Sequence, residues 1–400
     1  MNARQQYILL RSMMGLGFSL MFMASAIYRI DIANLEIYQL ILIGSALEIA
    51  MFLFETPTGV VADLKSRRLS IIIGLFIIGV GFIFEAITTY FFMIFIAQII
   101  WGLGYTFISG ALESWVSDET ENINIEQTMI TGAQFHQLFS IVGIILAAVI
   151  GMYNIRLAIY VSGGLFVLLG IITISTMKEH NFKKHPHDES LLKSYVSHLT
   201  KGFKHVKKNK VLRIMFVIML FFGLYSEGID RTYERYILNN LHMRDYFDVA
   251  PIWILSTINA VVAIFGYLIL HLVKKYLTKG HHLILWAINF TSMMIVGIIL
   301  FAFLPFEYFA VLGFMFFSIS REGTYPLLNT ILVKNTPSNI KATVLSGFGQ
   351  LDAIGQLISG GLMVGASILV GIQGMYLFTA ILLVVPVLLF MSLRGVKEWI

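Results

Sequence analysis

The stretch GVVADLKSRR at residues 59–68 decides the fold, because it places a short charged string between two long apolar runs. A second string, GYLILHLVKK at residues 266–275, repeats its spacing: a glycine is followed by the matching positions four, eight and nine residues later. The acid Asp63 of the first string is replaced by Leu270 in the second, whereas both strings end in two basic residues. The chain is therefore predicted to contain a repeat, with one such string in each half.

The composition indicates a protein that is surrounded mostly by lipid. Of the 400 residues, 58% are hydrophobic and 13% are charged, whereas soluble chains are roughly 45–50% apolar and about 25% charged. This excess of apolar residues excludes most soluble enzyme folds and nucleic-acid-binding modules. The chain has no cysteine, so disulfides, thiolate nucleophiles and cysteine metal sites are excluded too.

Apolar runs of the length that crosses a bilayer, about 20 residues, follow one another along the whole chain. They are continuous and do not alternate over ~10 residues, which excludes a membrane barrel. We therefore predict an all-α membrane protein with twelve transmembrane helices in two six-helix bundles. The expected spans are 7–29, 37–61, 69–88, 90–113, 127–150, 154–177, 211–235, 249–273, 282–304, 308–332, 341–367 and 371–393.

The longest polar stretch, Lys178 to Lys210, divides the chain. We expect an N-terminal bundle at 1–177, a linker at 178–210 and a C-terminal bundle at 211–400. The linker contains His180, His185 and His187. A histidine-rich tract can bind metal, but in a solvated linker we expect neither a metal site nor a cofactor.

The positions of Lys and Arg predict the orientation. Most of them fall at the N-terminus, in the linker, at the C-terminus and in the alternate loops that share their side of the membrane. Because basic loops remain inside, we expect a multi-pass plasma or inner membrane protein with both termini cytoplasmic. This asymmetry explains the net charge of +5 without a nucleic-acid partner. Residues 4–26 have some features of a cleavable signal peptide, but cleavage would leave five helices in one half, so we expect this segment to stay.

The matched strings and the six-plus-six layout resemble the major facilitator superfamily of secondary transporters, whose loop between helices 2 and 3 carries a Gly-x-x-x-Asp-x-x-x-Arg-Arg/Lys string. Residues 55–59, 109–113, 226–231 and 341–346 are similar to strings of its bacterial drug-efflux members. The resemblance implies two bundles around a central cavity, and transport by alternating access around a site at mid-membrane.

The resemblance also implies a cytoplasmic latch. In the family, the loop aspartate contacts the start of helix 11 and an acid that follows helix 4. Asp63 matches that aspartate, residues 341–346 open helix 11, and Asp118 or Glu113 is the second acid. The residues expected at the latch are Gly59, where glycine permits close backbone contact, Asp63, Arg67, Arg68 and Asp118.

Two departures from the family pattern concern proton coupling. Gln98 stands where helix 4 often carries an arginine linked to proton transfer, and residues 143–151 of helix 5 lack the proline found in many antiporters. Both departures weaken the inference of proton antiport and keep proton symport open.

Charged residues deep in the membrane are the candidate transport residues, because a charge there costs at least about 2.5–3.5 kcal/mol. Arg321 either lines the cavity or pairs with Asp352 or Glu322 and holds two helices together. His136 is either a proton carrier, since imidazole titrates near neutral pH, or a packing residue. The candidates for proton coupling or the substrate cavity are Glu48, Arg321, Glu322, Asp352, His136 and Asn259.

A second charged group lies toward the outer end of helix 7. Glu227 and Arg231 are spaced for an i,i+4 pair, and Asp230 lies beside them. These three residues are predicted to form an outer gate or a solvated helix end. Glu85 lies near a helix end and is expected at the membrane interface.

These residues predict function as follows. The acids at mid-membrane outnumber Arg321, so the cavity should attract cations and protons. We expect proton-coupled export of amphipathic or cationic small molecules by a monomer in the lipid bilayer. Proton-symport uptake of a small metabolite, and a lipid flippase or binding receptor, are the alternatives. No nucleotide-binding loop and no residue set for covalent chemistry occur in the sequence, so no enzyme activity is expected. Aromatic residues that could contact the substrate are Tyr28, Tyr225, Tyr233, Trp253 and Tyr325.

Overall fold

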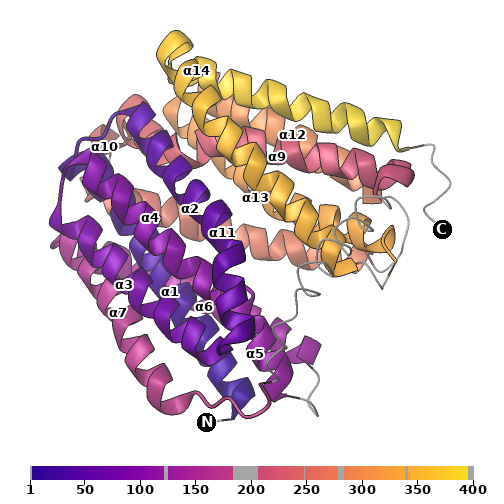
Figure 1. Cartoon of the computed structure of the whole chain (residues 1–400). Coiled ribbons are helices and arrows are strands. Elements are labelled where there is room, and N and C mark those ends of the chain that lie inside the picture. Colours follow the sequence, from indigo (N-terminus) through magenta and orange to yellow (C-terminus); the bar gives the residue numbers. More distant parts are fainter. Residues whose placement is uncertain are drawn as a thin grey trace. The chain divides into compact units, whose positions relative to one another are not determined.

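The computed structural model describes residues 2–120, 125–182, 206–246, 248–277, 283–337 and 341–394, and they form helices and short connections with no strand among them (Figure 1). Ten stretches of these residues are long and apolar enough to cross a membrane. The prediction of an all-α membrane protein is therefore confirmed.

The described helices follow the predicted order. In the N-terminal half they are α1 (Ala3–Ile27) with the π-helical turn η1 (Tyr28–Ile32), α2 (Ile37–Leu64), α3 (Arg67–Ile87), α4 (Phe91–Ile108), α5 (Ala111–Glu119), α6 (Ile125–Gly151) and α7 (Ile155–Thr176). In the C-terminal half they are α9 (Lys210–Arg235) with η2 (Tyr236–Asn240), α10 (Met243–Tyr246), α11 (Pro251–Leu277), α12 (Leu283–Phe303), α13 (Glu307–Lys334) and α14 (Lys341–Ser392).

Two glycines with a positive φ, Gly110 and Gly371, each interrupt a helix. The fourth span was predicted to continue to residue 113, but Gly110 has a φ of 72°, so α4 ends at Ile108 and α5 starts at Ala111. Gly371, with φ 71° and ψ 179°, divides α14 into two helices, as the predicted spans 341–367 and 371–393 require. Glycine tolerates this backbone conformation because it has no Cβ.

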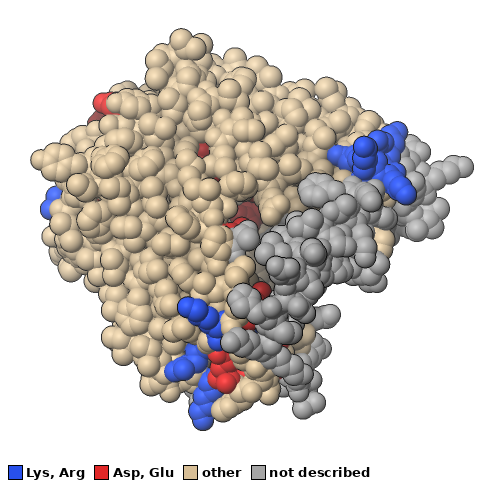
Figure 2. Space-filling model, viewed as in Figure 1, with Lys and Arg blue, Asp and Glu red and all other residues tan. Residues whose placement is uncertain are grey.

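The chain ahead of Gly371 is apolar and exposed. Ile368, Leu369 and Val370 are 67%, 83% and 62% exposed, so the last turn of this helix carries three apolar side chains outside the protein core. Much of the surface in view is likewise free of charge, with Lys and Arg in a few patches near its margins and some Asp or Glu atoms near its middle (Figure 2). Such a surface suits lipid contact.

Within each half, helices pack with their backbones in close approach at glycines. In the N-terminal half, α1 lies against α6, and a Cβ on Gly15 would overlap the carbonyl oxygen of His136. In the C-terminal half, α9 lies against α14, and a Cβ on Gly223 would overlap the carbonyl oxygen of Asp352. Small residues permit this approach in membrane proteins.

The structure forms two compact units: Met1–His187 with Phe247–Ala260, and Asp188–Tyr246 with Val261–Ile400. The division into bundles at 1–177 and 211–400 with a linker at 178–210 stays a prediction. Most of that linker, residues 183–205, lies outside the described residues, and His185 and His187 with it.

Candidate functional site

The principal polar cluster of the C-terminal unit centres on Arg321 of α13. Its guanidinium forms two hydrogen bonds with Asp230 of α9, with Nη1–Oδ1 at 2.5 Å and Nη2–Oδ2 at 2.8 Å. Pairing with Asp352 or Glu322 was one of two alternatives for Arg321; its partner is instead Asp230, and the other alternative, that Arg321 lines the cavity, stays a prediction. The planar guanidinium binds a carboxylate best through two parallel bonds, and α9 presents Asp230 in that geometry.

Two tyrosines flank the same guanidinium. The rings of Tyr225 and Tyr325 each have their centroid 5.9 Å from the Arg321 Cζ, within the range of a cation–π interaction. Tyr225 is fully buried, and its hydroxyl has no hydrogen-bond partner among the described residues. The cluster therefore offers a charge pair, two aromatic faces and a free hydroxyl.

Asp352 of α14 adds a second carboxylate to the cluster. Its Oδ2 accepts a hydrogen bond from Gln356 Nε2 at 2.9 Å, whereas Oδ1 is buried without a hydrogen-bond partner in the described part of the chain. Arg321 and Asp230 lie within electrostatic reach of it. A buried acceptor without a partner costs free energy, and a bound proton or cation would remove that cost.

Of the three residues of the predicted outer gate, Glu227 and Arg231 pair with each other. Arg231 Nε donates to Glu227 Oε1 at 2.9 Å, as the spacing predicts. Glu227 is only 2% exposed, so the alternative of a solvated helix end does not hold for it. Asp230 instead forms an ion pair with Arg321. Glu322 is exposed on the next position of α13, with its Cγ 3.0 Å from where a Cβ on Gly266 would lie.

In the N-terminal unit, His136 of α6 lies against α1. Its Nδ1 is 3.0 Å from the carbonyl oxygen of Arg11. A carbonyl can only accept, so Nδ1 carries the hydrogen and Nε2 is the basic nitrogen of the neutral ring. The Arg11 guanidinium itself faces Glu113 of α5, at 3.9 Å.

The two other cavity candidates remain predictions. Asn259 of α11 donates from Nδ2 to the carbonyl oxygen of Leu255, one turn earlier, at 2.9 Å. Glu48 is half-buried in α2. Neither observation assigns the residue to a substrate or a proton.

Three of the expected latch residues lie together. Arg67, in the first turn of α3, forms an ion pair with Asp118 of α5 and a longer one of 3.8 Å with Asp63. Arg68 instead donates to the carbonyl oxygen of Ile174 at 2.6 Å. At Gly59 a Cβ would meet no described atom within 4 Å, so the close backbone contact expected there is absent from the described residues. Most side chains of residues 341–346, the implied partner of Asp63, lie outside them.

Glu179, just after α7, also contacts this group of residues and was not predicted. Its carboxylate accepts hydrogen bonds from Ser66 Oγ at 2.5 Å, from the Arg67 amide at 2.8 Å and from the Arg68 amide at 3.1 Å. A carboxylate is favourable at a helix N-terminus, where amides are unsatisfied. No local sequence signal links Glu179 to α3, because more than a hundred residues separate them.

Glu85, expected at the membrane interface, lies two residues before the end of α3 and is fully buried in the protein. It accepts from Arg29 Nε at 2.7 Å and from Gln98 Nε2 at 2.7 Å, and Gln98 in turn accepts from Trp101 Nε1 at 2.9 Å. Gln98, at the position where the family often has an arginine, thus holds Glu85 in a network at the predicted outer end of the unit.

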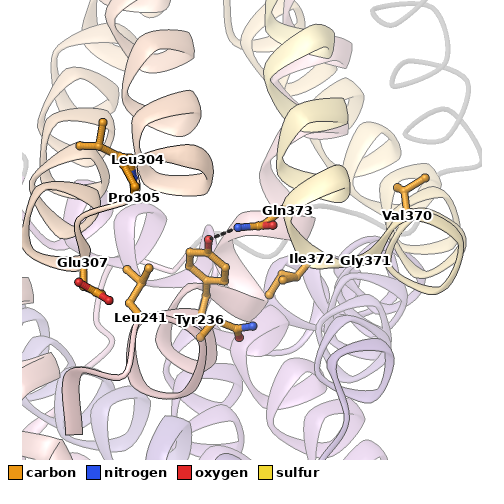
Figure 3. Close-up of a pocket in the computed structure, with 10 residues that line it drawn as sticks. Tyr236, Leu241, Leu304, Pro305, Glu307, Val370, Gly371, Ile372 and Gln373 are labelled. Atoms are coloured by element: carbon orange, nitrogen blue, oxygen red, sulfur yellow. Dashed lines mark hydrogen bonds between the residues drawn. The ribbon is translucent and has the colours of Figure 1, made fainter. Parts of the chain in front are cut away.

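A pocket of about 360 Å³ lies in the C-terminal unit where three connections meet: the end of η2, the turn between α12 and α13, and the break at Gly371 (Figure 3). Tyr236 and Gln373 form one wall, and both donate to the carbonyl oxygen of Ala302, each at 3.0 Å. Glu307 is the one charged residue of the lining. No group of three or more metal-ligating side chains occurs among the described residues.

Comparisons with known proteins identify the family. The model of the Major Facilitator Superfamily matches residues 7–360. The uncharacterized MFS-type transporter YxaM of Bacillus subtilis (strain 168) is 23% identical over 376 residues, which cover 91% of this chain and 89% of that protein.

Solved structures show the same fold. The nucleoside transporter NupG superposes with a TM-score of 0.79 at 17% identity, covering 99% of this chain and 100% of that one. A POT family transporter in complex with 5-aminolevulinic acid superposes with a TM-score of 0.77 at 14% identity, covering 98% and 95%. With its apolar helices and a family match across most of its length, the chain is a multi-pass membrane transport protein that belongs to the Major Facilitator Superfamily.

Proposed function

We propose that this transporter exports amphipathic or cationic small molecules in exchange for protons, by alternating access. The observation that carries the proposal is Asp352, whose buried Oδ1 lacks a partner beside the Asp230–Arg321 pair. Since that pair is neutral as a whole, Asp352 and the exposed Glu322 give the cluster a net negative charge that favours cations.

In the proposed cycle, Asp352 holds either a proton or the cationic group of the substrate. A proton that enters from the outer side neutralises Asp352 and releases the substrate. On the inner side the proton leaves, and the carboxylate binds the next cation. Tyr225 and Tyr325, held against Arg321, supply aromatic surface for the apolar part of the substrate. Glu48 is a second candidate for proton exchange.

The latch belongs to the same proposal. Arg67, at the start of α3, forms ion pairs with Asp118 of α5 and Asp63 of α2. Glu179 accepts a hydrogen bond from the backbone amide of Arg67 at the same helix end. We place the latch at the cytoplasmic ends of the helices, where it would stabilise the outward-open state, and both termini on the same side.

The test uses purified protein in vesicles with an imposed pH gradient, ethidium as the probe cation and a trapped dye that reports proton flux. We expect gradient-driven ethidium movement opposite to the proton flux, abolished in Asp352→Asn and reduced in Glu48→Gln. Asp245→Asn, which changes an exposed carboxylate outside the cluster, serves as the control. Normal exchange in Asp352→Asn would show that the assignment of coupling is wrong.

Proton-symport uptake of a small metabolite is the second candidate. The Asp230–Arg321 pair and the Tyr225 hydroxyl also suit a polar, ring-containing molecule. Proteins with a similar fold include a nucleoside transporter and a transporter solved with 5-aminolevulinic acid. Uridine and 5-aminolevulinic acid in the same vesicles separate the two: symport moves them in the direction of the proton flux. Binding without gradient-driven movement would indicate a receptor, and movement of labelled lipid would indicate a flippase.

A further inference from the structure

His136 and Asp352 occupy matching places in the two halves. In the N-terminal unit the carbonyl oxygen of His136 abuts Gly15 of α1, and in the C-terminal unit the carbonyl oxygen of Asp352 abuts Gly223 of α9. In the expected repeat, α1 and α9 are the first helices of their halves, and α6 and the first part of α14 are the fifth spans. The two contacts are therefore equivalent.

A second contact fixes the register of this equivalence. Seven residues after His136, Gly143 abuts the carbonyl oxygen of Leu16, the residue that follows Gly15. Seven residues after Asp352, the Ser359 hydroxyl donates at 2.6 Å to the carbonyl oxygen of Leu224, the residue that follows Gly223. Because two contacts have the same spacing in both helix pairs, the alignment of α1–α6 with α9–α14 cannot be shifted by a helical turn.

The surroundings of His136 leave one nitrogen for a proton. Its Nδ1–H is held by the Arg11 carbonyl oxygen, so only Nε2 can take up a proton, and the ring is half-buried. The charged group that faces it is Arg11 on α1, whose guanidinium in turn lies 3.9 Å from Glu113 on α5.

The groups that face Asp352 differ in kind and charge. They are Tyr225, Glu227 and Asp230 on α9 with Arg321 and Tyr325 on α13. Each of the two matching positions thus has an arginine beside it: Arg11, which pairs with Glu113, at His136, and Arg321, which pairs with Asp230, at Asp352.

We propose that His136 is a second proton-binding site of the transporter, the counterpart in the N-terminal unit of Asp352. The inference rests on the proposed function only in assigning a proton to Asp352. Each unit then carries one titrating group at the same place in the repeat: a carboxylate that is neutral when protonated, and an imidazole that is positive when protonated. Proton uptake at Nε2 forms an N–H bond while an O–H bond of a hydronium ion breaks and water is released.

The protonation itself can be measured without a substrate. The full chain, with nitrogen-15 histidine, is placed in lipid nanodiscs and its spectrum followed from about pH 5 to about pH 9. The His136 signals are those missing from His136→Asn, whose amide N–H can keep the hydrogen bond to the Arg11 carbonyl while the protonatable Nε2 is lost. We expect the Nδ1–H neutral form to convert to the charged ring as the pH falls. A ring that remains neutral throughout, or that carries its hydrogen on Nε2, would overturn the proposal.

The role in the cycle needs a second readout. Because the natural chain has no cysteine, spin labels can be attached to cysteines introduced at Tyr153 and Phe306, exposed turn residues of the two units. The distance distribution between the labels is then compared at low and high pH in the parent, His136→Asn, Asp352→Asn and the double variant. We expect each single variant to lose part of the pH-dependent shift and the double variant to lose all of it. His136→Gln, which also lacks a titrating group, repeats the test if His136→Asn fails to fold.

The four variants separate the two proposals. If Asp352→Asn removes the whole shift and His136→Asn none, His136 is only a packing residue and the role of Asp352 stands. If His136→Asn alone removes the shift, the proton assigned to Asp352 is wrong and the inference about His136 stands. A full shift in the double variant would overturn both.

Discussion

At the scale of single residues, burial decides what an ion pair contributes. Glu85 is fully buried, and Arg29 and Gln98 together occupy both of its oxygens. The Arg11–Glu113 pair is longer, at 3.9 Å, and the Glu113 side chain is 41% exposed. Removing one partner of a buried pair leaves a charge without compensation, whereas an exposed pair contributes little because water replaces the partner.

We therefore expect Glu85→Ala to destabilise the protein by about 3–5 kcal/mol, and Glu113→Ala by about 0–1 kcal/mol. Thermal unfolding followed by tryptophan fluorescence in detergent measures both. The replacement Glu85→Gln, which keeps the shape and one accepting oxygen but removes the charge, should fall between them. Equal melting temperatures for Glu85→Ala and Glu113→Ala would contradict this view of the network.

Residue contacts between helices are also where sequence reasoning was weakest. Arg321 was identified as a deep charge and Asp230 as part of a group toward the outer end of its helix, but their pairing depends on which faces of α9 and α13 meet. Glu179 gave no signal, because its partners at residues 66–68 are far away in sequence. The position of a charged residue within a hydrophobic run predicts its depth in the membrane, but it does not predict which helix it faces. Candidate residues could therefore be predicted, whereas their partners could not.

At the scale of helices, close backbone approach holds the pairs α1–α6 and α9–α14 together. A methyl group at Gly223 would overlap the Asp352 carbonyl and force the helices apart. Overpacking of this kind costs typically 1–3 kcal/mol. The displacement would also move the candidate carboxylate, so transport should fall together with stability.

Gly223→Ala should therefore lower the thermal stability and the gradient-driven flux. Gly361→Ala on α14 is the matched control, because a Cβ there meets no atom within 4 Å and alanine favours a helix over glycine by about 0.8–1.0 kcal/mol. We expect the control to keep or raise the melting temperature. An unchanged melting temperature in Gly223→Ala would show that α9 and α14 can separate without cost.

Helix positions were the part of the fold that the sequence predicted well. The runs at 154–177 and 282–304 match α7 and α12 closely, because apolar length is set by the bilayer. The prediction that failed, the extension of the fourth span to residue 113, ignored Gly110. A single glycine is compatible with a helix, so its positive φ is visible only in the structure.

At the scale of the whole molecule, the positions of Lys and Arg predict which face is cytoplasmic. The turn at Tyr153 is expected outside and the chain at Asn181 inside. Because the natural chain has no cysteine, single cysteines at these two positions can be labelled in intact cells with a membrane-impermeant maleimide. We expect labelling of Tyr153→Cys, and labelling of Asn181→Cys only after the membrane is permeabilised. The reverse pattern would invert the orientation and place the proposed latch outside.

The latch should bias the whole conformational equilibrium. Arg67 contacts Asp118 more closely than Asp63, so we expect Asp118→Asn to shift the resting state toward inward-open at least as far as Asp63→Asn. Distances between spin labels at the cytoplasmic ends of α3 and α9 measure the shift. Glu119→Gln, a change at a neighbouring acid that accepts backbone amides of the next segment, is the control. No shift in either aspartate variant would mean that Arg67 only orders the end of α3.

The break at Gly371 has a consequence for how deeply the protein sits in the bilayer. The two last helices reverse direction at a single glycine, and the residues before it, Ile368, Leu369 and Val370, are apolar and exposed. A tip of this composition is unfavourable in bulk water and favourable among the lipid headgroups and upper acyl chains. The turn should therefore act as an anchor that fixes the vertical position of these two helices, while the outer loops with charged residues remain in water.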